Sequence, residues 1–251
     1  MAGAAVRSRQ KKRQRLSAGQ KIALALAVLI VLGGAAALAY PAFSQWWNAR
    51  DQSSVVADYT LEIDNLDDTD AEEELQKARD YNRSLKDTVA TMDPFEADGT
   101  MDNPNYNTLL WATQEGVMAY VEIPKIGVLL PIYHGVGSDV LMKGVGHLPE
   151  TSLPVGGENT HCVLAGHSGM THARLFTDLP KLEIGDEFLI HVYDQTLTYM
   201  VDQIKPVIPT DTKDLNIVPG MDYVTLITCV PIGVNSHRLL LRGVRTFNID
   251  G

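Results

Sequence analysis

One run of the sequence constrains this chain more than any other. Residues 22–43, "IALALAVLIVLGGAAALAYPAF", contain 22 residues and no charged side chain. At about 1.5 Å of rise per residue, a helix of this length spans the roughly 30 Å hydrocarbon core of a bilayer. Seven Lys and Arg and no acid precede it in residues 1–21. The positive-inside rule therefore predicts a single-pass membrane anchor with a cytoplasmic N-terminus and an extracellular remainder.

A cleaved signal peptide is the alternative interpretation of the same run. Ala37-Leu38-Ala39 has the small-x-small pattern of a cleavage site. The length of the run and the pair Trp46 and Trp47, placed where an interfacial aromatic anchor would lie, favour an uncleaved anchor in the lipid bilayer. Under both interpretations the rest of the chain is exported.

The exported part is strongly acidic. Residues 22–251 carry 14 basic and 31 acidic side chains, a formal charge of −17. Such a surface repels the phosphate backbone, so the composition argues against nucleic acid as a partner.

An acidic helical segment follows the anchor. Thr69 and Glu72 have the spacing of a capping box, which predicts a helix start. Five positions then follow at intervals of three and four, as in an amphipathic helix of about five turns; they are Leu75, Ala78, Asn82, Leu85 and Val89. The residues 91–105, "TMDPFEADGTMDNPN", are typical of a loop.

From Tyr106 onward the sequence is rich in short β-type runs. At least seven such runs, bounded by Gly, Pro, Asp or Asn, end with "YVTLITC" and "RLLLRGV". Only residues 171–182, "THARLFTDLPKL", suggest a short helix between them. The pattern predicts a mostly β fold, an antiparallel barrel or sandwich.

The chain has two cysteines, and the sequence gives them different roles. Cys162 lies in the apolar run "THCVLAG", where a free cysteine behaves as a small buried hydrophobe. A disulfide to Cys229 is the alternative, but a domain of this size does not need one. Cys229 ends a predicted strand and is a candidate nucleophile, provided that a neighbouring group stabilises its thiolate.

Strand alternation selects the partner of Cys229. The loop "VPIGVNS" can reverse the chain and bring Arg238 beside the thiol, and His237 then faces away. An arginine there can stabilise the oxyanion of a tetrahedral intermediate. His167 in "LAGHSG" stands at a predicted strand end among small residues, a position that suits a catalytic acid or base.

These motifs together resemble the sortases, cysteine transpeptidases of Gram-positive cell surfaces. Their signature Thr-Leu-x-Thr-Cys is matched by Thr225, Leu226, Thr228 and Cys229, and the resemblance covers about residues 118–244. It implies that His167, Cys229 and Arg238 are catalytic. The implied fold is a closed β-barrel of about eight strands with short helices, which agrees with the strand count.

The loop "MDPFEADG" resembles the Asp-Pro-aromatic lid of class C, the pilin-polymerising sortases. Carried over to this chain, Asp93 pairs with Arg238, Pro94 follows it, and Phe95 covers the Cys229 thiol. We call Asp93–Phe95 the lid. Many class C members have a second hydrophobic segment at the C-terminus, a feature not seen in the residues up to Gly251.

The resemblance implies cleavage of an LPXTG-like sorting signal between Thr and Gly, through a thioacyl-enzyme. The acyl group is then transferred to a lysine of a pilin subunit, which polymerises pili. We expect no cofactor, and no metal site, because His161, His167 and His172 lack zinc-pair spacing. The expected division of the chain is a cytoplasmic tail (1–21), a membrane anchor (22–43), an extracellular stalk with the lid (44–105) and the catalytic barrel (106–251).

Three alternatives remain at this point. The chain could be a housekeeping-type sortase that anchors proteins to peptidoglycan, or a non-catalytic pilus assembly factor, although such a factor should have lost one of the three catalytic residues. An L,D-transpeptidase would carry a Ser-His-Gly-Cys type of motif, where this chain has Leu-Ile-Thr-Cys.

Overall fold

The structure is a computed structural model that describes residues 17–85, 93–96 and 104–246. It divides into two compact units, Met1–Phe43 and Ser44–Gly251. Most of the basic tail, up to residue 16, and the predicted helix position Val89 lie outside the described residues.

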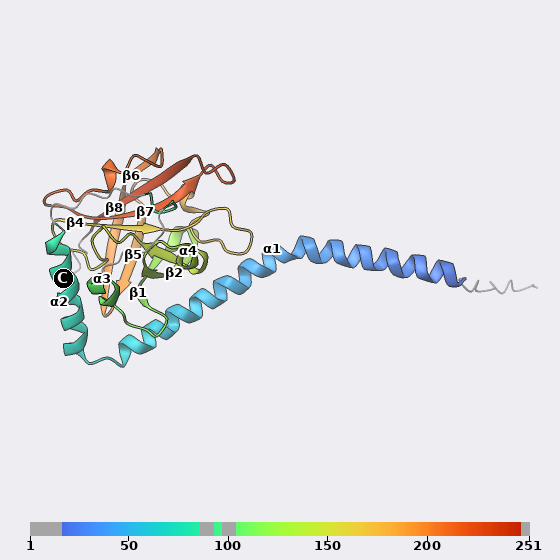
Figure 1. The fold of residues 1–251 in the computed structure, drawn as a ribbon, viewed down its shortest axis with the longest axis horizontal. Helices are drawn as coiled ribbons and strands as arrows, with labels where there is room; N and C mark the ends of the chain where they lie inside the picture. Colours follow the sequence, from blue (N-terminus) through green and yellow to red (C-terminus); the bar gives the residue numbers. More distant parts are fainter. Residues whose placement is uncertain (1–16, 86–92, 97–103, 247–251) are drawn as a thin grey trace, which may run out of the picture. The chain divides into compact units, whose positions relative to one another are not determined.

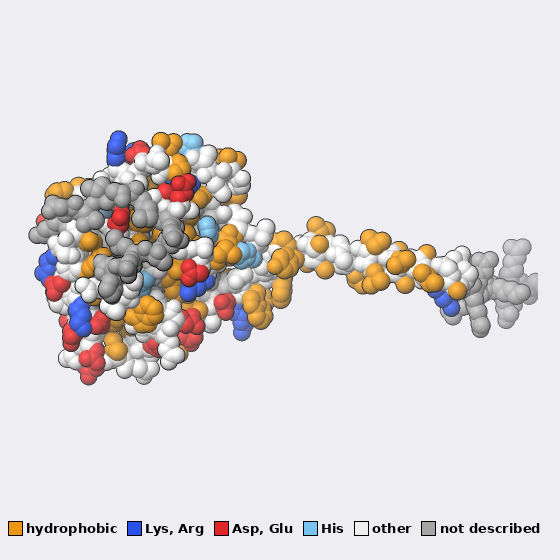
Figure 2. All heavy atoms as spheres, in the orientation of Figure 1, with side chains coloured by type: hydrophobic (Ala, Val, Ile, Leu, Met, Phe, Trp, Pro, Cys, Tyr) orange, Lys and Arg blue, Asp and Glu red, His pale blue; other side chains and the backbone are white. Residues whose placement is uncertain are grey.

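Helix α1, Ala18–Asp64, contains the apolar run. In its first part the large apolar side chains are exposed, and orange atoms run along the side of the helix that Figure 2 shows. By length and composition this helix could cross a membrane, which fits a single-pass anchor. The helix passes through Pro41 without ending. It then continues for a further 21 residues beyond Phe43, where the apolar run ends.

The later part of α1, from Ser44, belongs to the second unit and packs against the barrel of that unit. Tyr59 is 1% exposed, and its hydroxyl donates to the Met118 carbonyl (3.3 Å) and accepts from the Tyr193 amide (2.8 Å). Asn48 Nδ2 donates to the His172 carbonyl (2.7 Å). This segment is therefore fixed to the barrel by both apolar and polar contacts.

Helix α2, Asp68–Ser84, is the predicted amphipathic helix. Its buried face contains the predicted positions Leu75, Ala78 and Asn82, and the predicted position Leu85, the C-cap residue after the helix, is also buried. The predicted cap was wrong, because Asp67 is the N-cap and accepts from the Thr69 amide (3.0 Å). A carboxylate at this position also interacts favourably with the helix dipole.

Eight strands close into a barrel in the order β1-β2-β3-β4-β7-β8-β6-β5, with β5 returning to β1 (Figure 1). The strands are β1 Val117–Ile123, β2 Val128–His134, β3 Val145–His147, β4 Thr160–Ala165, β5 Glu187–Val192, β6 Gln195–Val207, β7 Asp222–Val230 and β8 His237–Arg245. The short helix α3, Pro104–Thr108, precedes β1. Other short helices lie between strands: η1 Pro124–Ile126, α4 Ser138–Lys143, η2 Leu179–Lys181 and η3 Lys213–Leu215. The predicted closed barrel is confirmed.

Two expectations for the barrel were wrong, and one strand was missed. The strands are not all antiparallel, since β3 runs parallel to β2 and β4 parallel to β7. The helix expected in residues 171–182 is a series of turns that ends in η2, and β3 was missed because three residues show no periodicity. Every residue of β4 is buried, as is typical of a strand covered on both faces.

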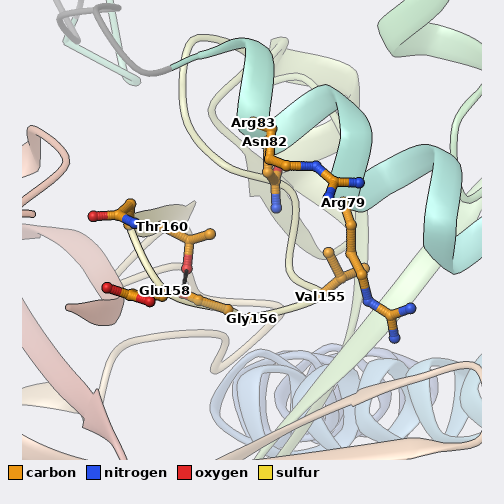
Figure 3. Close-up of a pocket in the computed structure, with 9 residues that line it drawn as sticks. Arg79, Asn82, Arg83, Val155, Gly156, Glu158 and Thr160 are labelled. Atoms are coloured by element: carbon orange, nitrogen blue, oxygen red, sulfur yellow. Dashed lines mark hydrogen bonds between the residues drawn. The ribbon is translucent and has the colours of Figure 1, made fainter. Parts of the chain in front are cut away.

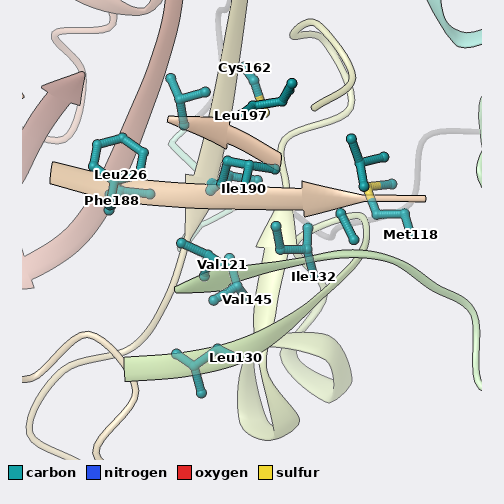
Figure 4. Packing of buried hydrophobic residues seen from close by; sticks show 14 of the residues in the cluster. Met118, Val121, Leu130, Ile132, Val145, Cys162, Phe188, Ile190, Leu197 and Leu226 are labelled. Atoms are coloured by element: carbon teal, nitrogen blue, oxygen red, sulfur yellow. The ribbon is translucent and has the colours of Figure 1, made fainter. Parts of the chain in front are cut away.

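The barrel core consists of apolar side chains from strands around the barrel (Figure 4). Cys162 is among them at 2% exposure, and both cysteines are free thiols. Burial raises the pKa of Cys162 well above its ordinary value. The prediction that Cys162 is a buried hydrophobe is confirmed, and its thiol is held in the unreactive, protonated form.

We expect Tyr59→Phe to destabilise the protein, because it leaves the buried Tyr193 amide without its partner. The expected loss in the free energy of unfolding is about 1–3 kcal/mol. It can be measured by urea titration of the full chain in detergent micelles. Leu61→Ala is the matched control on the exposed side of the same helix and should stay within about 0.5 kcal/mol of wild type; an equal loss in both variants would contradict the account.

Candidate active site

Cys229 and Arg238 lie opposite each other on antiparallel strands. The register pairs Cys229 of β7 with Arg238 of β8 and Val230 with His237. Directly opposed residues project to the same face of a sheet, so Cys229 and Arg238 share one face while His237 lies on the other. The predicted arrangement is confirmed, and the exposed His237 is separated from the thiol.

His167 lies two residues after the end of β4, beside the end of β7. The last backbone bond between these chains runs from the Gly166 amide to the Ile227 carbonyl (3.1 Å). His167 is partly buried, and among the described residues no hydrogen bond holds its ring nitrogens. The fold thus brings His167, Cys229 and Arg238 to the ends of three neighbouring strands.

The lid lies over this site. Asp93 accepts from Arg238 Nε (2.9 Å) and Nη2 (2.6 Å), and both side chains are 6% exposed. The Phe95 ring lies 5.6 Å from the His167 ring and 5.2 Å from the Arg238 guanidinium carbon. The predicted ion pair is present, while cover of the thiol itself by Phe95 stays a prediction.

All three nitrogens of the Arg238 guanidinium group have acceptors. The Asp93 carboxylate accepts from Nε and Nη2, and the Asn235 carbonyl accepts from Nη1 (2.9 Å). A bidentate, buried pair of this kind is strong and geometrically specific. With the lid in this position, the donors that could stabilise an oxyanion are already occupied.

The electrostatics of the site favour neutral forms of its two titrating groups. Burial raises the pKa of the Cys229 thiol; Arg238 opposes this rise, and the Asp93 carboxylate adds to it. Burial also lowers the pKa of His167. Both shifts favour the neutral form of the group, the protonated thiol for Cys229 and the uncharged imidazole for His167.

The signature residues before Cys229 support the site from β7. Thr225 Oγ1 bonds to His161 Nε2 (2.7 Å), and Leu226 is fully buried in the core. Thr228, also fully buried, donates from Oγ1 to the Gly166 carbonyl (2.7 Å). These side chains hold β7 in place and do not form part of the reactive surface.

Two groups of the site were missed in the sequence. Ser168 Oγ donates to the Cys229 carbonyl (2.6 Å), and the Asn235 carbonyl holds Arg238. Ser168 could have been suspected because it follows His167 directly. No sequence pattern indicates the contact of Asn235, since any residue supplies a backbone carbonyl.

The other buried histidines have structural roles. His147 bonds to Tyr106 and to the Ser152 carbonyl, and burial lowers its pKa to about 3. His161 is held by Thr225 and the Asn216 carbonyl, and burial lowers its pKa to about 4. Within the described ranges, no group of three or more His, Cys, Asp or Glu could hold a metal ion.

Figure 3 shows a pocket of about 330 Å³ between α2 and the loop before β4. Arg79 and Arg83 line it, but their charges are compensated by Glu72 and Asp80. None of the three predicted catalytic residues lines this pocket. We therefore assign it no part in the chemistry.

Comparison with known proteins identifies the family. A family model described as the sortase domain matches residues 121–246, half of the chain. Sortase D of Bacillus subtilis is 31% identical over 170 residues, which cover 65% of this chain and 83% of that protein. The chain belongs to the sortase family of cysteine transpeptidases.

Similar solved structures indicate the class of sortase to which this chain is related. Sortase C-1 from Streptococcus pneumoniae is 43% identical, with 78% of this chain and 100% of that chain covered, at a TM-score of 0.73. Sortase C-1 from Actinomyces oris is 46% identical, with 71% and 99% covered and a TM-score of 0.67. These structural neighbours of the chain are class C sortases, which is the class that the lid motif predicts.

We predict that the double variant Asp93→Ala, Phe95→Ala increases the rate at which a thiol reagent labels Cys229. Loss of the carboxylate lowers the thiol pKa, so the pH midpoint of labelling should move to lower pH. The rate can be measured by mass spectrometry of the Cys229 peptide.

Glu96→Gln is the matched control, because Glu96 lies in the same turn but is exposed and does not bond to Arg238. It should label like the wild type. If the double variant also had the wild-type rate and midpoint, the lid would not control access to the thiol.

Proposed function

We propose that this chain is a pilin-polymerising, class C sortase with Cys229 as nucleophile, His167 as acid and base, and Arg238 as the oxyanion-stabilising residue. The observation that carries the proposal is the buried Asp93–Arg238 ion pair beside Cys229. The similar structure of sortase C from Streptococcus pneumoniae, described with pilin substrate specificity, supports the choice of substrate.

The first half-reaction breaks a peptide bond. With the lid displaced, the Cys229 thiol transfers its proton to His167, and the thiolate attacks the Thr carbonyl of an LPXTG-like sorting signal. Arg238 stabilises the oxyanion, in the place that the Asp93 carboxylate occupies when the lid is closed. His167 then donates the proton to the leaving Gly amine, which leaves a thioester on Cys229.

The second half-reaction forms the new bond. The amine of a pilin lysine attacks the thioester, its proton passes to His167, and the Cys229 thiolate leaves. The product is an isopeptide bond, and the thiol recovers its proton from His167. Covering the site against water favours transfer over hydrolysis.

The rest of the chain fits this role as a membrane-bound enzyme. We propose that residues 1–21 are cytoplasmic, that 22–43 anchor the chain, and that 44–105 form the extracellular stalk and lid. The catalytic barrel, 106–251, then faces the outside, where pilin subunits with sorting signals and acceptor lysines are exported. The basic residues before α1 and the acidic surface after it support this orientation.

We expect Cys229→Ala and His167→Ala to abolish transfer of a sorting-signal peptide to a lysine-containing acceptor. His237→Ala should retain wild-type activity, because His237 lies on the opposite face. The assay is chromatography of the ligated product formed by the full chain in detergent micelles. Clear residual transfer by Cys229→Ala, or loss of transfer in His237→Ala, would refute the assignment.

A further inference from the structure

Two hydroxyl groups join the segment that carries His167 to the strand that carries Cys229. Thr228 Oγ1 donates to the Gly166 carbonyl (2.7 Å), and Ser168 Oγ donates to the Cys229 carbonyl (2.6 Å). The acceptor of one bond adjoins His167, and the acceptor of the other belongs to the proposed nucleophile itself. The two bonds thus lie on either side of the reacting pair.

These bonds begin where the backbone ladder ends. β4 and β7 are paired as far as Ala165 and Ile227, and the Gly166 amide makes the last backbone bond. If the parallel ladder continued, the Ser168 amide would donate to the Cys229 carbonyl. The Ser168 hydroxyl takes that place, which lets the backbone leave the sheet at His167 without losing its connection to β7.

The segment after His167 folds back on itself. The Phe176 amide donates to the His167 carbonyl (3.0 Å), and the Gly169 amide donates to Thr177 Oγ1 (3.0 Å). A Cβ atom on Gly169 would lie 2.4 Å from the Ile232 side chain, so the loop after Cys229 packs closely on this segment. The local backbone around His167 is therefore well fixed, and Ser168 ties it to Cys229.

The ring of His167 lies beside the Phe95 ring of the lid (5.6 Å between ring centres) and otherwise depends on that backbone for its position. No carboxylate or carbonyl among the described residues bonds to the imidazole, unlike the buried His147 and His161. Proton transfer needs the donor and acceptor atoms within about 2.6–3.2 Å of each other. A displacement of about 1 Å can reduce a rate by about a hundredfold.

We propose that Ser168 is a positioning residue that, together with Thr228, sets the position of the His167 imidazole relative to the Cys229 thiol. This inference rests on the catalytic assignment made under Proposed function. Ser168 does not touch the substrate in this account; its hydroxyl acts through the backbone of the nucleophile.

The test compares Ser168→Ala with Ser168→Thr in the full chain in detergent micelles, with a sorting-signal peptide and a lysine-containing acceptor. Ser168→Ala should lower kcat by about tenfold and leave KM within about twofold, because proton transfer and not binding is impaired. The solvent deuterium isotope effect on kcat should rise. Ser168→Thr keeps the hydroxyl and should restore most of kcat.

Ser236→Ala is the matched control, since Ser236 lies on the adjacent loop and, among the residues that the structure describes, its hydroxyl bonds only to the exposed His237. It should have wild-type kinetics. A kcat for Ser168→Ala within about twofold of wild type would overturn the positioning role. The positioning role would also be overturned if the lower kcat were fully explained by a smaller amount of active protein. That amount is measured as the fraction of Cys229 that a thiol reagent titrates.

The Cys229→Ala variant separates the two proposals. If it is inactive while Ser168→Ala behaves as wild type, only the positioning role is wrong. If Cys229→Ala itself retains transfer, the catalytic assignment fails.

Discussion

The register between β7 and β8 is the constraint on which the rest of the site depends. It sets Cys229 opposite Arg238, so that a thiol and a guanidinium group share one face of the barrel. A shift by one residue would put His237 in the place of Arg238 and turn the cation away. The parallel pairing of β4 with β7 then brings His167 to the same end of the barrel.

In the proposed mechanism, the cation that stabilises the oxyanion is also the one that holds the lid over the site. Arg238 engages Asp93 through two nitrogens, in a pair that is almost completely buried. Separating a buried ion pair is costly unless another anionic oxygen replaces the carboxylate. A developing oxyanion has the required charge, which explains how substrate could compete with the lid for one set of donors. Burial raises the pKa of the Cys229 thiol and lowers the pKa of the His167 imidazole, so this arrangement favours the neutral form of both groups.

Much of this could be predicted from the sequence, by two different kinds of argument. Alternation along the strand and the reversing loop were enough to pair Cys229 with Arg238 and to exclude His237. The Asp93 contact came from resemblance, because nothing local links residues 145 positions apart. Three features were missed: the parallel pairing, the three-residue strand β3 and the Ser168 hydrogen bond. Each depends on contacts with distant segments of the chain, which the periodicity of the sequence does not indicate. The capping error at Thr69 is of another kind: two capping residues compete within three positions, and Asp67 forms the cap.

The central claim is that Cys229, and not the buried Cys162, carries the acyl group during transfer. The most direct measurement is mass spectrometry of the full chain, quenched in acid during turnover of a sorting-signal peptide and then digested. The account predicts a thioester adduct with the mass of the acyl fragment on the peptide that contains Cys229. An adduct on the Cys162 peptide, or turnover with no adduct on Cys229 under single-turnover conditions, would contradict it.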